Sequence, residues 1–196
     1  MIKYKSSTLN LDRQGMTLVE MMISLSIFAV VLGVVFSFMQ NTSNSYQKTR
    51  QKVQYQQSVR AAISLMSREI RSTGCDPEAI GFDRFGQADA NVLQCRMDLN
   101  GDQDITDNNP DEDVTYTFVA ASGELSRDVG AGDQVILKDL QSLTFRYFDS
   151  SGNELLGLPL NAVDRALVHF VDMTLTGETG MGESMSFTTR VSIRNG

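Results

Sequence analysis

Residues 13–39 read RQGMTLVEMMISLSIFAVVLGVVFSFM, and the rest of the chain is organised around them. The nineteen residues from 21 to 39 include no charged residue and no proline. At about 1.5 Å of rise per residue, such a run forms a helix of roughly 28 Å, close to the thickness of the hydrocarbon core of a bilayer. We therefore expect one membrane-spanning helix near the N-terminus.

Two general kinds of segment contain such a run. A secretory signal peptide has a shorter apolar core and a small-residue cleavage site, whereas this run is followed by Gln40 and no Ala-x-Ala pattern. A plain signal anchor would keep Lys3, Lys5 and Arg13 in the cytoplasm and export the remainder. Neither assigns a role to Glu20, the carboxylate at the edge of the run.

The sequence GMTLVE, residues 15–20, ahead of an apolar helix resembles the type III signal of type IV prepilins and pseudopilins. The resemblance implies cleavage after Gly15 by a prepilin peptidase and N-methylation of the new first residue, Met16. The usual first residue is Phe. Met16 departs from that pattern, as minor members of the family often do.

Glu20 is costly in lipid unless it has a partner. Cleavage would create an ammonium group on Met16, less than two helical turns away. In a packed helical fibre, Glu20 could meet the Met16 amine of a neighbouring subunit and so set the axial register. The alternative for Glu20 is a carboxylate that the helix dipole favours in the first turn.

Length and composition bound the remainder. The chain has 196 residues, enough for one membrane helix and one globular domain. Its 41% hydrophobic and 21% charged residues are ordinary for a domain with a packed core. The formal net charge is −7, and removal of a leader with net charge +2 would leave −9. This balance disfavours nucleic acid as a partner and permits cation binding.

Residues 46–72 are predicted to form an amphipathic helix, which Thr73 and Gly74 end. Its apolar stripe comprises Tyr46, Val53, Val59, Ile63, Met66 and Ile70. Pilins, as the resemblance implies, have one long helix whose first half anchors and polymerises and whose second half lies in a globular head. The expected organisation is a leader (1–15), a membrane and polymerisation helix (16–39), an amphipathic continuation (40–74) and a β-rich periplasmic head (75–196).

Alternating apolar and polar residues predict strands in the head. They cover residues 91–97, 114–120, 124–128, 134–137, 143–148, 166–176 and 187–194, with a glycine-rich turn at 177–183. Hairpin-length links favour antiparallel pairing, so the expected fold class is α+β, with the long helix packed on the sheet.

Cys75 and Cys95 are the only cysteines in the sequence. An even number in an exported domain favours a disulfide, which would stabilise the head by roughly 3 kcal/mol on the chain-entropy model. Two unpaired buried thiols are the alternative. A zinc site would need more ligands than these.

Residues 97–113, MDLNGDQDITDNNPDED, are strongly acidic and include no basic residue. The candidate Ca²⁺ ligands are Asp98, Asn100, Asp102, Asp104 and Asp107. The run resembles the start of a calcium loop of the EF-hand or dockerin type, D-x-N-x-D. It departs from that loop at Gln103, where glycine is usual, and at Asn109, where a bidentate Glu is usual. The alternative is a solvated acidic hairpin loop.

No catalytic arrangement is apparent in the sequence, so we do not expect an enzyme. The single histidine, His169, lies within a strand pattern. The sequence has no P-loop and no G-x-G-x-x-G.

Four later segments, LMSREIRSTGCDP, DLNGDQD with DVTYTF, LTFRYFDSSGNEL and TTRVSIRN, resemble PilW-type minor pilins. These are relatives of the J-type minor pseudopilin of type II secretion. The resemblance implies an inner-membrane subunit with a periplasmic head that joins the tip or initiation complex of a type IV pilus. Its partners would be the prepilin peptidase, other major and minor pilins, and the inner-membrane assembly machinery. The alternatives are a minor pseudopilin of type II secretion and a signal-anchored periplasmic calcium-binding module.

Overall fold

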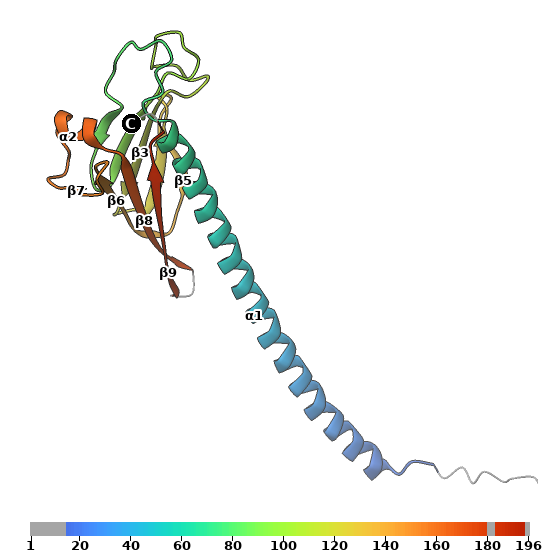
Figure 1. Cartoon of the computed structure of the whole chain (residues 1–196). Helices are drawn as coiled ribbons and strands as arrows, with labels where there is room; N and C mark the ends of the chain where they lie inside the picture. Colours follow the sequence, from blue (N-terminus) through green and yellow to red (C-terminus); the bar gives the residue numbers. More distant parts are fainter. Residues whose placement is uncertain (1–14, 180–182, 195–196) are drawn as a thin grey trace, which may run out of the picture. The chain divides into compact units, whose positions relative to one another are not determined.

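The computed structural model describes residues 15–179 and 183–194 (Figure 1). The chain divides into two compact units, residues 1–47 and residues 48–196. The basic residues of the predicted leader, Lys3, Lys5 and Arg13, lie outside the described residues.

The first unit contains the N-terminal part of helix α1 (Leu18–Ser72). This helix is long and apolar enough to cross a membrane. Its large apolar side chains between Met16 and Met39 are all exposed, as expected for a surface that faces lipid or other helices. An apolar N-terminal helix of this kind indicates a membrane anchor.

In the second unit, α1 packs one face on the head. Its buried apolar residues are Val59, Ala62, Met66 and Ile70, at helical spacing. The predicted stripe is therefore confirmed in its C-terminal half, with Ile63 partly buried, whereas Tyr46 and Val53 are exposed. The helix ends at Ser72, and Gly74 adopts a φ of 77°, as the predicted stop requires.

Two antiparallel sheets make up the rest of the head (Figure 1). The first has the order β1-β2-β3-β4-β5, with β1 (Phe85–Ala88), β2 (Val92–Arg96), β3 (Asp113–Val119), β4 (Glu124–Asp128) and β5 (Gln134–Leu137). The second has the order β7-β6-β8-β9, with β7 (Glu154–Leu155), β6 (Leu140–Phe148), β8 (Phe170–Thr179) and β9 (Glu183–Ser192). A long N-terminal helix with antiparallel sheets confirms the predicted α+β, pilin-like class.

The structure corrects the prediction at residues 166–176, which are not one strand. A short helix, α2 (Ala162–Leu167), precedes β8, and Asn161 caps it by accepting hydrogen bonds from the backbone of Val163 and Asp164. The predicted turn at 177–183 is also too long, because β8 continues to Thr179 and pairs Gly177 with Met185. Strands β1 and β7 were not predicted.

The helix and both sheets share one apolar core. The sheets are joined where the amide of Phe145 donates to the carbonyl of Ala90 at 2.7 Å and that of Leu160 donates to Ala88 at 2.8 Å. Tyr147, fully buried, donates its hydroxyl to the carbonyl of Asp89 at 2.7 Å. These hydrogen bonds join the β1–β2 hairpin of the first sheet to β6 and to the segment that follows β7.

Candidate functional site

Thr17 and Glu20 form a reciprocal cap at the start of α1. The backbone amide and hydroxyl of Thr17 donate to Glu20 Oε2 at 2.9 and 3.0 Å, and the amide of Glu20 donates to Thr17 Oγ1 at 3.3 Å. This is the capping box of the pattern T-x-x-E, which satisfies amide groups that the first helical turn otherwise leaves unpaired. The cap gives Glu20 a partner within its own chain, a role that the pattern TLVE could have revealed in the sequence.

The neighbouring residues of the predicted cleavage site are accessible. Met16 is 70% exposed and precedes the helix, and Gly15 has no atom within 4 Å of the place where a side chain would begin. An uncrowded peptide bond ahead of a helix is accessible to a protease.

The acidic loop connects β2 to β3, and two buried carboxylates stand at its ends. Asp98 and Glu112 are both fully buried. The amide of Asp98 donates to the carbonyl of Cys75 at 2.8 Å, and the amide of Met97 donates to the carbonyl of Glu112 at 2.9 Å. The two carboxylates are therefore positioned by the strand ends and by the segment that follows α1.

The loop turns tightly around Asp98. Asp98 Oδ1 accepts a hydrogen bond from the amide of Gly101 at 2.6 Å, and Asp98 Oδ2 accepts one from the amide of Gln103 at 3.3 Å. Gly101 and Gln103 have φ values of 75° and 74°. Gln103 thus adopts the left-handed conformation that glycine usually supplies at this position of a calcium loop, despite its side chain.

The structure brings only some of the predicted metal ligands together. Oxygen atoms of Asp98, Asp102 and Glu112 all lie within 4.8 Å of one another. Asp104 instead accepts from Thr106, and Asp107 accepts from the side-chain amide of Asn100. Neither Asp104 nor Asp107 belongs to the cluster. Glu112, which does, was not among the predicted ligands.

Cys75 and Cys95 are free thiols in this structure. Cys95 is fully buried on β2, whereas Cys75 is partly exposed. Burial raises the pKa of the Cys95 thiol to about 12, so that it stays protonated at neutral pH. The disulfide stays a prediction.

A charged network lies between α1 and the first sheet. Arg127 donates to Glu69 Oε1 at 2.7 Å and to Asp111 Oδ2 at 2.7 Å, and the buried Tyr116 hydroxyl also donates to Glu69. Burial and the Glu69 carboxylate raise the pKa of Tyr116, and the two carboxylates raise that of Arg127 despite its burial. Glu69 is not part of the predicted apolar stripe, but it is buried and joins α1 to the first sheet through these hydrogen bonds.

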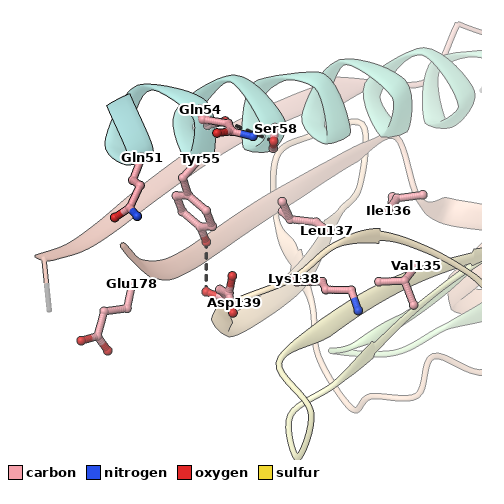
Figure 2. A pocket seen from close by; sticks show the side chains of 10 residues that line it. All are labelled: Gln51, Gln54, Tyr55, Ser58, Val135, Ile136, Leu137, Lys138, Asp139 and Glu178. Carbon is pink, nitrogen blue, oxygen red and sulfur yellow. Dashed lines mark hydrogen bonds between the residues drawn. The ribbon is translucent and has the colours of Figure 1, made fainter. Parts of the chain in front are cut away.

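A groove runs between α1 and the β5–β6 connection (Figure 2). Gln51, Gln54 and Ser58 line it from the helix, Lys138 from the β5–β6 connection and Glu178 from β8. Tyr55 closes one side by donating to the carbonyl of Asp139 at 3.1 Å. Polar and charged side chains share the lining with the apolar Val135, Ile136 and Leu137, and no nucleophile is hydrogen-bonded to a base among them, so the groove is a surface depression between packed elements.

His169 packs edge-on against Phe170, with 4.8 Å between ring centroids and 77° between planes. It is partly buried directly before β8. His169 is therefore half-buried as predicted, but it lies just before the strand and not within it.

One family model matches the chain, the prokaryotic N-terminal methylation motif, at residues 10–36. The motif is the substrate signal of the prepilin peptidase and indicates a type IV pilin or pseudopilin. Families with this motif are generally structural. A search of curated proteins finds no match to this chain.

Proposed function

We propose that the chain is a minor pilin, cleaved after Gly15, methylated on Met16 and incorporated into the tip or initiation complex of a type IV pilus. The observation that carries the proposal is the methylation motif at residues 10–36 on a helix that can span a membrane. The PilW-type resemblance of the head segments supports the minor role.

The same features suggest where the protein acts and with what. The subunit resides in the inner membrane with its head in the periplasm. Prepilin peptidase processes it in the membrane. The assembly machinery then moves it into the fibre, where the exposed apolar side chains of residues 16–39 pack against other major and minor pilins. Burial of that surface replaces the contact with lipid.

Glu20 is the assembly residue in this proposal. Both hydrogen bonds from Thr17 end on Oε2, and Oε1 accepts none from residues 15–179 or 183–194. A carboxylate oxygen at the membrane edge favours a cationic partner. The methylated Met16 amine of a neighbouring subunit is such a group and would set the axial register.

Three variants separate capping from assembly in a strain that lacks the native gene. Glu20→Ala removes the cap and the charge, and Glu20→Gln keeps a hydrogen-bond acceptor but no charge. Thr17→Ala removes the two hydrogen bonds of the Thr17 hydroxyl and keeps both the backbone hydrogen bond and the charge. We expect all three to be cleaved, and only Thr17→Ala to enter sheared pili, as detected by immunoblotting. Normal incorporation of both Glu20 variants would refute the register role.

The motif is shared with pseudopilins, which makes a minor pseudopilin of type II secretion the second candidate. Deletion of the gene distinguishes the two. Loss of surface pili with normal secretion of exoproteins supports the pilin, whereas loss of secretion with normal pili supports the pseudopilin.

A further inference from the structure

Glu112 has a buried side-chain oxygen with no hydrogen-bond partner among the described residues. Its side chain is fully buried, and Oε1 accepts from the amides of Leu99 at 2.7 Å and Asn100 at 3.2 Å. Oε2 is equally buried but has no hydrogen-bond partner within the described part of the chain. An unpartnered charged oxygen in a protein interior is costly, so a native fold normally supplies a partner.

The surroundings of Glu112 add negative charge. Asp98, also fully buried, and Asp102 place carboxylate oxygens within 4.8 Å of a Glu112 oxygen and of each other. Within residues 15–179 and 183–194, none of these three carboxylates is paired with a Lys or Arg. Like charges at this separation repel strongly where water is excluded.

The nearest arginines along the adjoining strands have other partners. Arg127 is held by Glu69 and Asp111, both at 2.7 Å, and Arg96 lies 3.4 Å from Asp113. Both arginines therefore pair with the sequence neighbours of Glu112, Asp111 and Asp113. Glu112 itself has no cationic partner within the described residues.

We propose that Asp98, Asp102 and Glu112 bind a Ca²⁺ ion that closes the acidic loop between β2 and β3. The cation would take the place of a partner for Glu112 Oε2 and neutralise the cluster. Loop carbonyl groups and water would complete the six to eight oxygen ligands that Ca²⁺ requires. The proposal does not depend on the pilin function.

The ligand set favours Ca²⁺ over other divalent ions. Every group is a hard oxygen donor, which disfavours Zn²⁺, and His169 and the cysteines are outside the cluster. Ca²⁺ holds oxygens at 2.3–2.6 Å, so two ligands on opposite sides lie up to about 5 Å apart, which accommodates oxygens within 4.8 Å. Mg²⁺ gives up its water reluctantly and rarely binds in such a protein-lined site.

The ligand set also accounts for the incomplete EF-hand-like pattern. Asn109 occupies the twelfth position, where a bidentate Glu usually closes the loop. Here the amide of Glu112 donates to the carbonyl of Asp107 at 3.0 Å, and Asn108 bridges to Asp111, so that residues 108–111 form a local turn. The closing carboxylate is then supplied from position fifteen, by Glu112.

The test is isothermal titration of the detergent-solubilised, full-length chain, first stripped with a chelator, with CaCl₂. We expect about one equivalent of Ca²⁺ to bind, and a raised thermal unfolding midpoint with CaCl₂ but not with equimolar MgCl₂. Glu112→Gln keeps the shape and the acceptor for Leu99 but removes the charge, and should weaken binding at least tenfold.

Asp104→Asn is the matched control. It removes the same charge from the same loop but lies outside the cluster, so its affinity should stay within threefold of the parent. Equal weakening by both substitutions would overturn the assigned ligand set in favour of a diffuse acidic loop. If Glu112→Gln does not fold, the parent chain still tests the site. A parent chain that binds no Ca²⁺, and whose thermal unfolding midpoint does not change at millimolar CaCl₂, would refute it.

Discussion

The Glu69 carboxylate should contribute more to the stability of the head than any other charged group on α1. Glu69→Ala leaves the Arg127 guanidinium, whose side chain is 11% exposed, without two of its hydrogen bonds and the buried Tyr116 hydroxyl without an acceptor. Removing one partner of a buried ion pair typically costs about 3–5 kcal/mol. Because Arg127 keeps Asp111, we expect a loss near the lower end, about 3 kcal/mol.

In a domain of this size, about 3 kcal/mol corresponds to a fall in Tm of roughly 6–12 °C. The assay is thermal unfolding of the detergent-solubilised chain, followed by near-ultraviolet circular dichroism. Arg68→Ala is the control, since Arg68 is exposed on the adjacent helical position and should change stability by less than about 0.5 kcal/mol. A Tm for Glu69→Ala within about 2 °C of the parent would show that the network contributes little, and the burial argument would be wrong.

Three further predictions concern the packing, ionisation and thiols of the head. A Cβ on Gly177 would lie 1.6 Å from the Tyr55 hydroxyl, so Gly177→Ala should lower the free energy of unfolding by about 1–3 kcal/mol in a denaturant titration, and a neutral result would exclude this helix–strand contact. Burial raises the pKa of Tyr116 above the value of about 10 for an unfolded chain. The stability that the neutral hydroxyl contributes is therefore complete below about pH 10 and is lost as the pH rises further. Between about pH 8 and 11.5, the Tm of Tyr116→Phe should fall less steeply than the Tm of the parent. If Cys75 and Cys95 are joined as their sequence context predicts, neither will react with iodoacetamide in protein extracted from membranes with detergent until reductant is added. Free thiols would instead show alkylation of Cys75 alone at neutral pH.

The parts of the fold that local patterns determine could be predicted from the sequence. The end of α1 follows from Gly74, and β4 and β5 were predicted with the bounds that they have, because each is a short alternating run between turn residues. Strand β1, with Gly86 in its middle, and the six-residue helix α2 have no such pattern, and they depend on contacts with the rest of the head.

Buried charges were the main feature that the sequence concealed. Glu69 is buried because Arg127, 58 residues later, meets it, and Glu112 because the loop brings it to Leu99, 13 residues earlier. Periodicity treats a charged residue as exposed, and only the tertiary arrangement shows otherwise. The motif at residues 15–20, in contrast, is contiguous in the sequence, which is why the sequence alone suffices to propose it.

The most direct test of the account is the intact mass of the protein after co-expression with an active prepilin peptidase. We predict the mass of residues 16–196 plus one methyl group, with the methyl group on the amine of Met16. A chain that keeps residues 1–15 although the peptidase processes a known substrate in the same cells would contradict the pilin assignment. Glu20 would then be only the capping partner of Thr17.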